Sequence, residues 1–141
     1  MISVQGMNAL LRKIAQANDE VQGKIKRANQ ITSLNIERQA KRNAPTNQKI
    51  GAGGRLRSAI TPDHSGTEAN VEVKVDYAQY VEFGTGAFAA EYLATKDKDL
   101  REYAMTFYET GRGRLPARPF LFPAAEAERP KHIERMRKAL Q

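Results

Sequence analysis

Apolar residues recur every three or four positions over the first third of the chain, and no other feature limits the fold as strongly. The pattern runs from Asn8 to about Arg42 through Leu10 or Leu11, Ile14, Ala17, Val21, Ile25, Ala28, Ile31, and Leu34 or Asn35. Such spacing places apolar side chains along one side of an amphipathic helix. A helix of about 35 residues is about 52 Å long, which exceeds the diameter of a domain of this size.

The predicted helix is therefore expected to project beyond the body of the protein or to bend. Gly23 is the position where a bend costs least, because glycine is a poor helix former. The apolar side needs a cover, which either a C-terminal helix or a neighbouring subunit would supply. The helix should end near Asn43, because Pro45 disfavours helical geometry at Ala44.

The length of 141 residues is that of one ordinary domain with a single core. We expect an α+β fold in which a long N-terminal helix and a kinked C-terminal helix pack on a small, mostly antiparallel sheet. The predicted parts of this single domain, 1–141, are a helix at 1–43, a sheet core at 44–86 and 115–122, a variable helical excursion at 87–114, and a helix at 123–141.

A strand is predicted from Val71 to Asp76, where apolar and charged side chains alternate. Its expected partners are residues 58–61, joined to it through a turn at 62–67, and residues 118–121, which would return to the sheet as another strand. A short helical turn at residues 56–60 should lead into the first of these partners.

Two further helices are indicated by apolar spacing. Within the excursion, Thr95 or Asp97 could cap a helix that runs to about Glu109, and its apolar residues are Leu93, Leu100, Tyr103, Ala104 and Phe107. In the C-terminal helix, Pro123 suits the first turn, whereas Pro130 should kink the helix or split it in two.

Composition narrows the class of protein. A formal net charge of +7, from 23 Lys and Arg against 16 Asp and Glu, attracts polyanions or acidic protein surfaces without choosing between them. The chain has no cysteine, which excludes disulfides, thiolate metal sites and cysteine nucleophiles. No apolar run approaches the roughly 20 residues that span a bilayer, so we expect a soluble, unexported protein that does not contact membranes.

Catalytic groups are sparse. The two histidines, His64 and His132, belong to no metal-binding motif and are expected to be solvent-exposed, and the glycines at 51–54 lack the Gly-Lys-Ser or Gly-Lys-Thr ending of a phosphate loop. We therefore expect no enzyme activity, no cofactor, no metal and no small-molecule substrate. A hydrolase is the least favoured class, since it would depend on a metal held by these histidines.

Glu82 is the one acidic residue that the sequence singles out, because its neighbours Val81 and Phe83 predict partial burial. A buried carboxylate requires a cationic or N–H partner. One interpretation is an internal ion pair with Arg55, Arg57 or Arg118, or capping of the turn at 84–86. The other is a pairing across a subunit boundary.

Three sequence blocks together resemble one known family. They are Ala44-Pro45 followed by Gly53 to Ile60, then Tyr77 to Gly86, then Ala117 to Ala124. In this order they are similar to the signatures of the tail-component family named after the tenth gene product of Hong Kong 97-like phages. The motif core comprises Tyr77, Tyr80, Val81, Glu82, Phe83, Gly84, Arg118, Pro119, Phe120, Leu121 and Pro123. The chain departs from the family in a longer loop between Pro45 and Gly54 that lacks an acidic residue.

The resemblance implies a structural virion morphogenesis protein of the bacteriophage or prophage head-tail junction, a ring subunit in the neck or in tail completion. Implied partners are further copies of itself and head-completion, tail-terminator or tail-tube proteins. It implies assembly in the host cytoplasm and a final place in the virion neck or tail. Basic residues that would face an interface or DNA are Arg112, Arg114, Arg135 and Arg137. The alternative function is a small basic nucleic-acid-binding protein.

Overall fold

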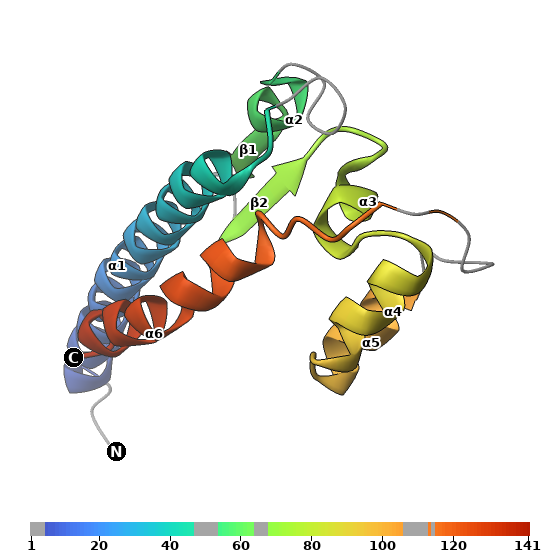
Figure 1. The fold of residues 1–141 in the computed structure, drawn as a ribbon. Coiled ribbons are helices and arrows are strands. Elements are labelled where there is room, and N and C mark those ends of the chain that lie inside the picture. Colours follow the sequence, from blue (N-terminus) through green and yellow to red (C-terminus); the bar gives the residue numbers. More distant parts are fainter. Residues whose placement is uncertain (1–4, 47–53, 64–67, 106–112, 114) are drawn as a thin grey trace.

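The amphipathic pattern at the start of the chain forms one long helix, α1, from Gln5 to Asn43 (Figure 1). The helix continues through Gly23, where the sequence made a bend least costly, without interruption. The computed structural model describes residues 5–46, 54–63, 68–105, 113 and 115–141. The remaining elements are α2 (Arg55–Ser58), β1 (Ile60–Asp63), β2 (Asn70–Val73), α3 (Ala78–Phe83), α4 (Gly86–Ala94), α5 (Lys98–Met105) and α6 (Phe122–Ala139). The predicted α+β class is confirmed.

The C-terminal helix covers part of α1. Side-chain bonds join Asn35 to Glu128 and Thr32 to His132, so the two helices run antiparallel. The far end of α6 reaches Lys24 and Ala28 through Ala139. Before Lys24, the described side chains of α1 from Arg12 onward are exposed except for the half-buried Val21. The N-terminal part of α1 therefore projects past α6, as its length required.

Two antiparallel strands form the sheet among the residues that the structure describes, with β1 on β2 in the register Ile60↔Val73 to Asp63↔Asn70. The pairing of these segments was predicted correctly, although β2 ends at Val73 rather than at Asp76. Pro62 lies within β1 opposite Val71. A proline is tolerated there because β1 is an edge strand.

The predicted third strand at residues 118–121 is wrong. This segment forms no ladder with β1 or β2 in the described structure. The Arg118 N–H donates to the carbonyl of Val81, 2.8 Å away, and Pro119 has no N–H to give. The amides of Phe120 and Leu121 donate to a side chain instead, so the backbone donors that a strand would need are already in use.

Helices occupy more of the middle of the chain than the sequence suggested. Residues 78–83, assigned to the sheet core, form α3, and the excursion contains α4 and α5 with a break at 95–97. The Leu100 N–H donates to Asp97 Oδ1 at 2.9 Å, which confirms Asp97 as a helix cap. The expected helix end near Glu109 lies outside the described residues, as does most of the loop between Pro45 and Gly54.

Pro123 stands at the start of α6, as predicted, and Pro130 lies inside it. The helix is continuous from Phe122 to Ala139, so Pro130 does not split it.

Buried side chains form two clusters that meet at the start of α6. The larger one joins α1, α2, the two strands, α3 and α6 through residues such as Ile36, Leu56, Ile60 and Phe120. The smaller one consists of Phe83, Leu93 and Ala104, with Tyr92, Leu100 and Phe122 packed against it. Figure 1 shows the consequence: the α4–α5 pair stands apart from α1 and α6, with α3 between them.

Candidate functional site

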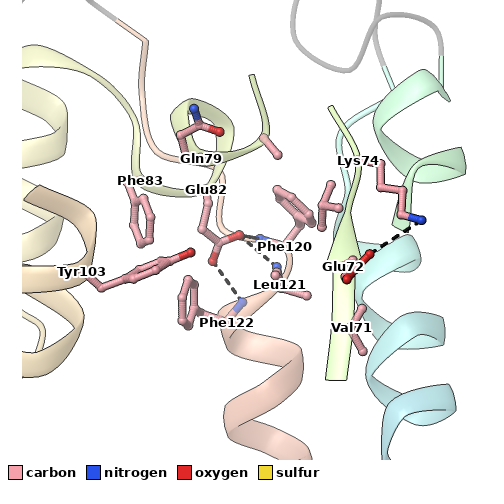
Figure 2. A pocket seen from close by; sticks show the side chains of 12 residues that line it. Val71, Glu72, Lys74, Gln79, Glu82, Phe83, Tyr103, Phe120, Leu121 and Phe122 are labelled. Carbon is pink, nitrogen blue, oxygen red and sulfur yellow. Dashed lines mark hydrogen bonds and ion pairs between the residues drawn. The ribbon is translucent and has the colours of Figure 1, made fainter. Parts of the chain in front are cut away.

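Glu82 occupies the junction between α3 and the start of α6. Its side chain is buried, with 3% of its surface exposed. Oε2 accepts the N–H groups of Phe120 at 2.8 Å and Leu121 at 2.9 Å, and Oε1 accepts that of Phe122 at 3.0 Å (Figure 2). These amides precede or begin α6, where a helix leaves N–H groups without intrahelical partners. The carboxylate therefore caps α6 from another part of the chain.

The sequence predicted this burial and the need for a partner, but the predicted ion pair is wrong. No salt bridge joins Glu82 to Arg55, Arg57 or Arg118 in the described part of the chain, and all three side chains are exposed. Backbone N–H groups at a helix start satisfy a carboxylate without a cation, because they carry partial positive charge. The sequence had offered capping of the 84–86 turn as the other internal role for Glu82, whereas in the structure its carboxylate caps α6.

Burial dominates the electrostatics around Glu82. It raises the pKa of the Glu82 carboxyl above its usual value, the three backbone hydrogen bonds lower that pKa, and the charge of Glu126 raises it further, so that the net direction is upward. Burial, and then the charges of Glu82 and Glu126, raise the pKa of Tyr92 to about 12. The site thus concentrates negative charge within a chain of net positive charge.

The two aromatic blocks of the sequence are joined here by backbone contacts. Thr85 N–H donates to Leu115 O, and Leu115 N–H donates to Thr85 Oγ1, both at 2.8 Å. Gly84 has a φ of 76°, and a Cβ on it would lie 2.6 Å from Ala117 N. Glycine is required at this position both by its backbone conformation and by the approach of the second block.

The structure brings most of the predicted motif core together. Val81, Phe83 and Phe120 are buried, and Tyr77 and Leu121 pack against the larger cluster. Tyr80 and Arg118 are exposed at the surface. Pro119 is half-buried, and Pro123 lies in the first turn of α6. The motif residues therefore serve mainly to pack α3 against the start of α6 around Glu82.

A hollow of about 450 Å³ lies beside this junction. Figure 2 shows Glu82 and Tyr103 pointing toward one another in it, with β2 on its far side. Its walls are part of β2, the aromatic rings of Phe83, Tyr103, Phe120 and Phe122, and Glu82. The rings of Phe83 and Phe122 lie 5.4 Å apart, and that of Tyr103 is 6.4 Å from Phe83 in an edge-on arrangement.

A second polar group, which sequence reasoning missed, joins α1 to α6. Glu128 accepts a hydrogen bond from Asn35 and forms a 2.5 Å ion pair with Arg135. Arg135 also donates to Thr32, whose hydroxyl lies 2.7 Å from His132 Nδ1. His132 is thus half-buried and partnered, contrary to the exposed imidazole that was predicted. The available signal was the polar run Asn29, Thr32 and Asn35 at helical spacing inside an apolar stripe.

Burial opposes ionisation of Glu128, but the hydrogen bonds from Asn35 and Arg135 and the charges of Arg135 and Lys131 outweigh it. The pKa of Glu128 therefore lies below its usual value.

The four arginines that the sequence analysis placed at an interface or facing DNA differ in their surroundings. Arg135 is held between α1 and α6 by Glu128 and Thr32. Arg137 is exposed, 3.8 Å from Glu134. Arg112 and Arg114 lie outside the described residues, as does His64.

Within the described ranges, no group of three or more His, Cys, Asp or Glu side chains could hold a metal ion. None of the helices described is long and apolar enough to cross a membrane.

Comparison with known protein families gives a match to this chain. The family model described as "Bacteriophage HK97-gp10, putative tail-component" matches residues 8–84, more than half of the chain. The matched range extends from α1 through the two strands to Gly84 at the end of α3. No curated protein and no solved structure matches.

Proposed function

We propose a structural role at the head-tail junction for this chain, which belongs to the bacteriophage HK97-gp10 family of tail components. In this proposal the chain is one subunit of a ring in the neck or upper tail. It acts by contact with further copies of itself and with head-completion, tail-terminator or tail-tube proteins. The family supports a structural role rather than catalysis. Assembly would take place in the host cytoplasm, and the assembled protein would be part of the virion.

The observation that carries the proposal is apolar surface that one copy leaves uncovered. Leu140 is 65% exposed and Ile133 is 45% exposed. They are seven residues apart at the end of the chain, Ile133 on α6 and Leu140 directly after it, and therefore lie on one side of the molecule. Ile31 and Leu34 are exposed on α1, and Phe88 on α4. Single exposed apolar residues are ordinary, but such a set on the outer helices suits contacts with neighbours.

A groove between α1 and α6 supports a protein partner over DNA. Ala28, Ile31 and Ala139 form an apolar floor, and Lys24, Arg27 and Lys138 stand along its edges. An apolar floor with a charged rim is typical of protein interfaces, whereas duplex DNA is held mainly by phosphate contacts.

The test is a measurement of mass by analytical ultracentrifugation over a wide range of protein concentration. We expect the mass to rise with concentration, and Ile133→Ser with Leu140→Ser to abolish the rise while leaving the melting temperature unchanged. Arg57→Ser, an exposed change on α2 away from these apolar residues in the sequence, is the control and should associate like the parent protein. A mass that stays monomeric throughout would contradict self-assembly in isolation.

The alternative function, binding of nucleic acid, makes a different prediction in the same preparation. Binding of duplex DNA that is strong at low salt and collapses at moderate salt would favour it, because such binding depends on counterion release. We expect no DNA binding at physiological salt.

A further inference from the structure

The hollow beside Glu82 stands where the sequence predicted a third strand. One wall is β2, lined by residues 71–74, and the opposite wall is the segment 120–122. That segment cannot complete the sheet, because the amides of Phe120, Leu121 and Phe122 donate to Glu82. The fold thus separates the expected strand from β2 and leaves a space between them (Figure 2).

The edge of β2 that faces away from β1 is available for pairing. The Lys74 N–H donates to Ala59 O, and these residues lie opposite each other when the register is extended by one position. Hydrogen-bonded pairs alternate in an antiparallel ladder, so Val71 and Val73 direct their N–H and C=O groups away from β1. No other segment pairs with this edge in the part of the chain that the structure describes. A free strand edge is a template for an added strand.

The charge of the hollow specifies what kind of segment would fit. Glu82 lines it, and three N–H groups use three of the roughly four acceptor positions of its carboxylate. One position on Oε1 remains, and no cationic side chain forms a salt bridge with Glu82 among the described residues. The rings of Phe83, Tyr103 and Phe122 surround the same space. A carboxylate beside aromatic faces suits a guanidinium, which can both donate to the acid and stack on the rings.

We propose that the hollow accepts an extended segment of a partner protein, which pairs with the free edge of β2 and places an arginine side chain between Glu82 and the surrounding rings. The partner is a different protein rather than a second copy. Neither strand of a second copy could supply the arginine, since β1 (Ile60–Asp63) and β2 (Asn70–Val73) contain none. Arg118 lies in a segment whose amides at Leu115, Arg118 and Phe120 already donate within the molecule. This inference does not rest on ring formation and can be tested separately from it.

The experiment uses the full chain, labelled with ¹⁵N, and the capped peptide acetyl-Ser-Thr-Val-Arg-Val-Thr-amide as the probe. We expect the peptide to shift the Val71 and Val73 amide resonances and to slow their hydrogen exchange, with saturable binding. A peptide with citrulline in place of arginine, which has the same shape but no charge, should bind about tenfold more weakly. A peptide N-methylated on the amides that would face β2 should not bind.

Glu82→Gln should bring the affinities for the arginine and citrulline peptides to within about twofold of each other. Because this variant is expected to be less stable, the citrulline and N-methyl peptides provide the test on the unaltered protein. Equal binding of arginine and citrulline peptides, or shifts that avoid Val71 and Val73, would overturn the proposal. Protection of these amides without peptide, rising with protein concentration, would identify a second copy as the occupant and overturn the assignment to a different protein.

Discussion

Glu82 on α3 accepts the backbone N–H of Phe120 at 2.8 Å, although the two residues are 38 positions apart in the chain. With the neighbouring bonds from Leu121 and Phe122, this contact fixes where α6 begins. α6 in turn covers α1. One carboxylate therefore links the two aromatic blocks of the sequence to the long helices that carry the exposed apolar surface.

Replacing Glu82 by glutamine should destabilise the protein. Glutamine has nearly the same shape as glutamate, but one of the two carboxylate oxygens is replaced by an NH₂ group. At least one backbone N–H that now donates to Glu82 would then lose its acceptor. Leaving a buried donor without its acceptor costs about 1–3 kcal/mol, and we expect a loss in that range in urea unfolding at pH 5. Glu91→Gln on the exposed side of α4 is the control and should change stability by less than about 0.5 kcal/mol. Equal stability of Glu82→Gln and the parent would disprove the capping role.

Glu82 and Glu128, the two buried acids, should change the free energy of unfolding in opposite directions as pH rises. Burial, as the largest cause, raises the pKa of Glu82 above the usual 4.5 of a glutamate. The folded state then binds the proton more tightly than the unfolded state, so the contribution of Glu82 to stability falls as pH rises above 4.5 through the folded pKa. The destabilisation caused by Glu82→Gln should accordingly shrink as pH rises through the folded-state pKa of Glu82.

Glu128 should behave in the opposite way. Its pKa is lowered, because the hydrogen bonds from Asn35 and Arg135 outweigh the effect of burial. The contribution of Glu128 to the free energy of unfolding is present above the pKa that Glu128 has in the unfolded state. This contribution is lost as pH falls through the pKa that Glu128 has in the folded state. Unfolding free energies of Glu128→Gln and the parent should therefore converge at acidic pH. If the destabilisation by Glu82→Gln and the destabilisation by Glu128→Gln changed with pH in the same direction, the opposite pKa shifts of the two residues would be contradicted.

Two glycines provide a matched comparison of backbone constraint. In Gly84→Ala the new Cβ would lie 2.6 Å from Ala117 N and 2.8 Å from Leu115 O, at a φ of 76°. Only backbone movement can relieve such contacts, so we expect a loss of at least about 1–3 kcal/mol. In Gly23→Ala the Cβ meets nothing within 4 Å, and the helix should gain about 0.5–1 kcal/mol. Thermal unfolding of both variants measures the contrast, and a stable Gly84→Ala protein would refute the close approach.

Much of the architecture follows from periodicity alone. The stripe from Asn8 to Arg42 specifies α1, and the alternation after Val71 specifies β2, because each pattern repeats the geometry of its element. Pro123 in the first turn of α6 and the cap at Asp97 are local signals of the same kind. Such elements are predictable because neighbouring residues determine them.

The conformation of residues 118–121 depends on atoms that are distant in the sequence and could not be predicted from neighbouring residues. The adjacent apolar residues Phe120 and Leu121 are compatible with a buried strand, but Glu82 accepts the amides that a strand would use. Burial of Glu82 could be inferred from Val81 and Phe83, whereas its partners could not, since a carboxylate is satisfied equally well by an arginine or by N–H groups. The polar contacts between α1 and α6 were missed because they require knowing which helices pack together.

Those polar contacts give a further prediction. In a double-mutant cycle, the half-buried Arg135 and the buried Glu128 should show a coupling free energy above about 1 kcal/mol, because removing one partner leaves the other buried without compensation. Arg137 and Glu134 form an exposed pair at 3.8 Å and should couple by no more than about 0.5 kcal/mol. Urea unfolding of the single and double variants to methionine and glutamine measures both. Equal coupling in the two pairs would show that the α1–α6 contact is not specified by Arg135 and Glu128.

The central claim is that this chain is a structural part of a phage tail assembly, and quantitative mass spectrometry of purified tailed particles tests it most directly. Particles would be produced from cells that carry the gene with an affinity tag and purified by density, away from free protein. We predict several copies of the chain per particle, in a fixed ratio to the major tail protein, and particles lacking joined tails when the gene is deleted. Absence of the chain from intact particles would contradict the account.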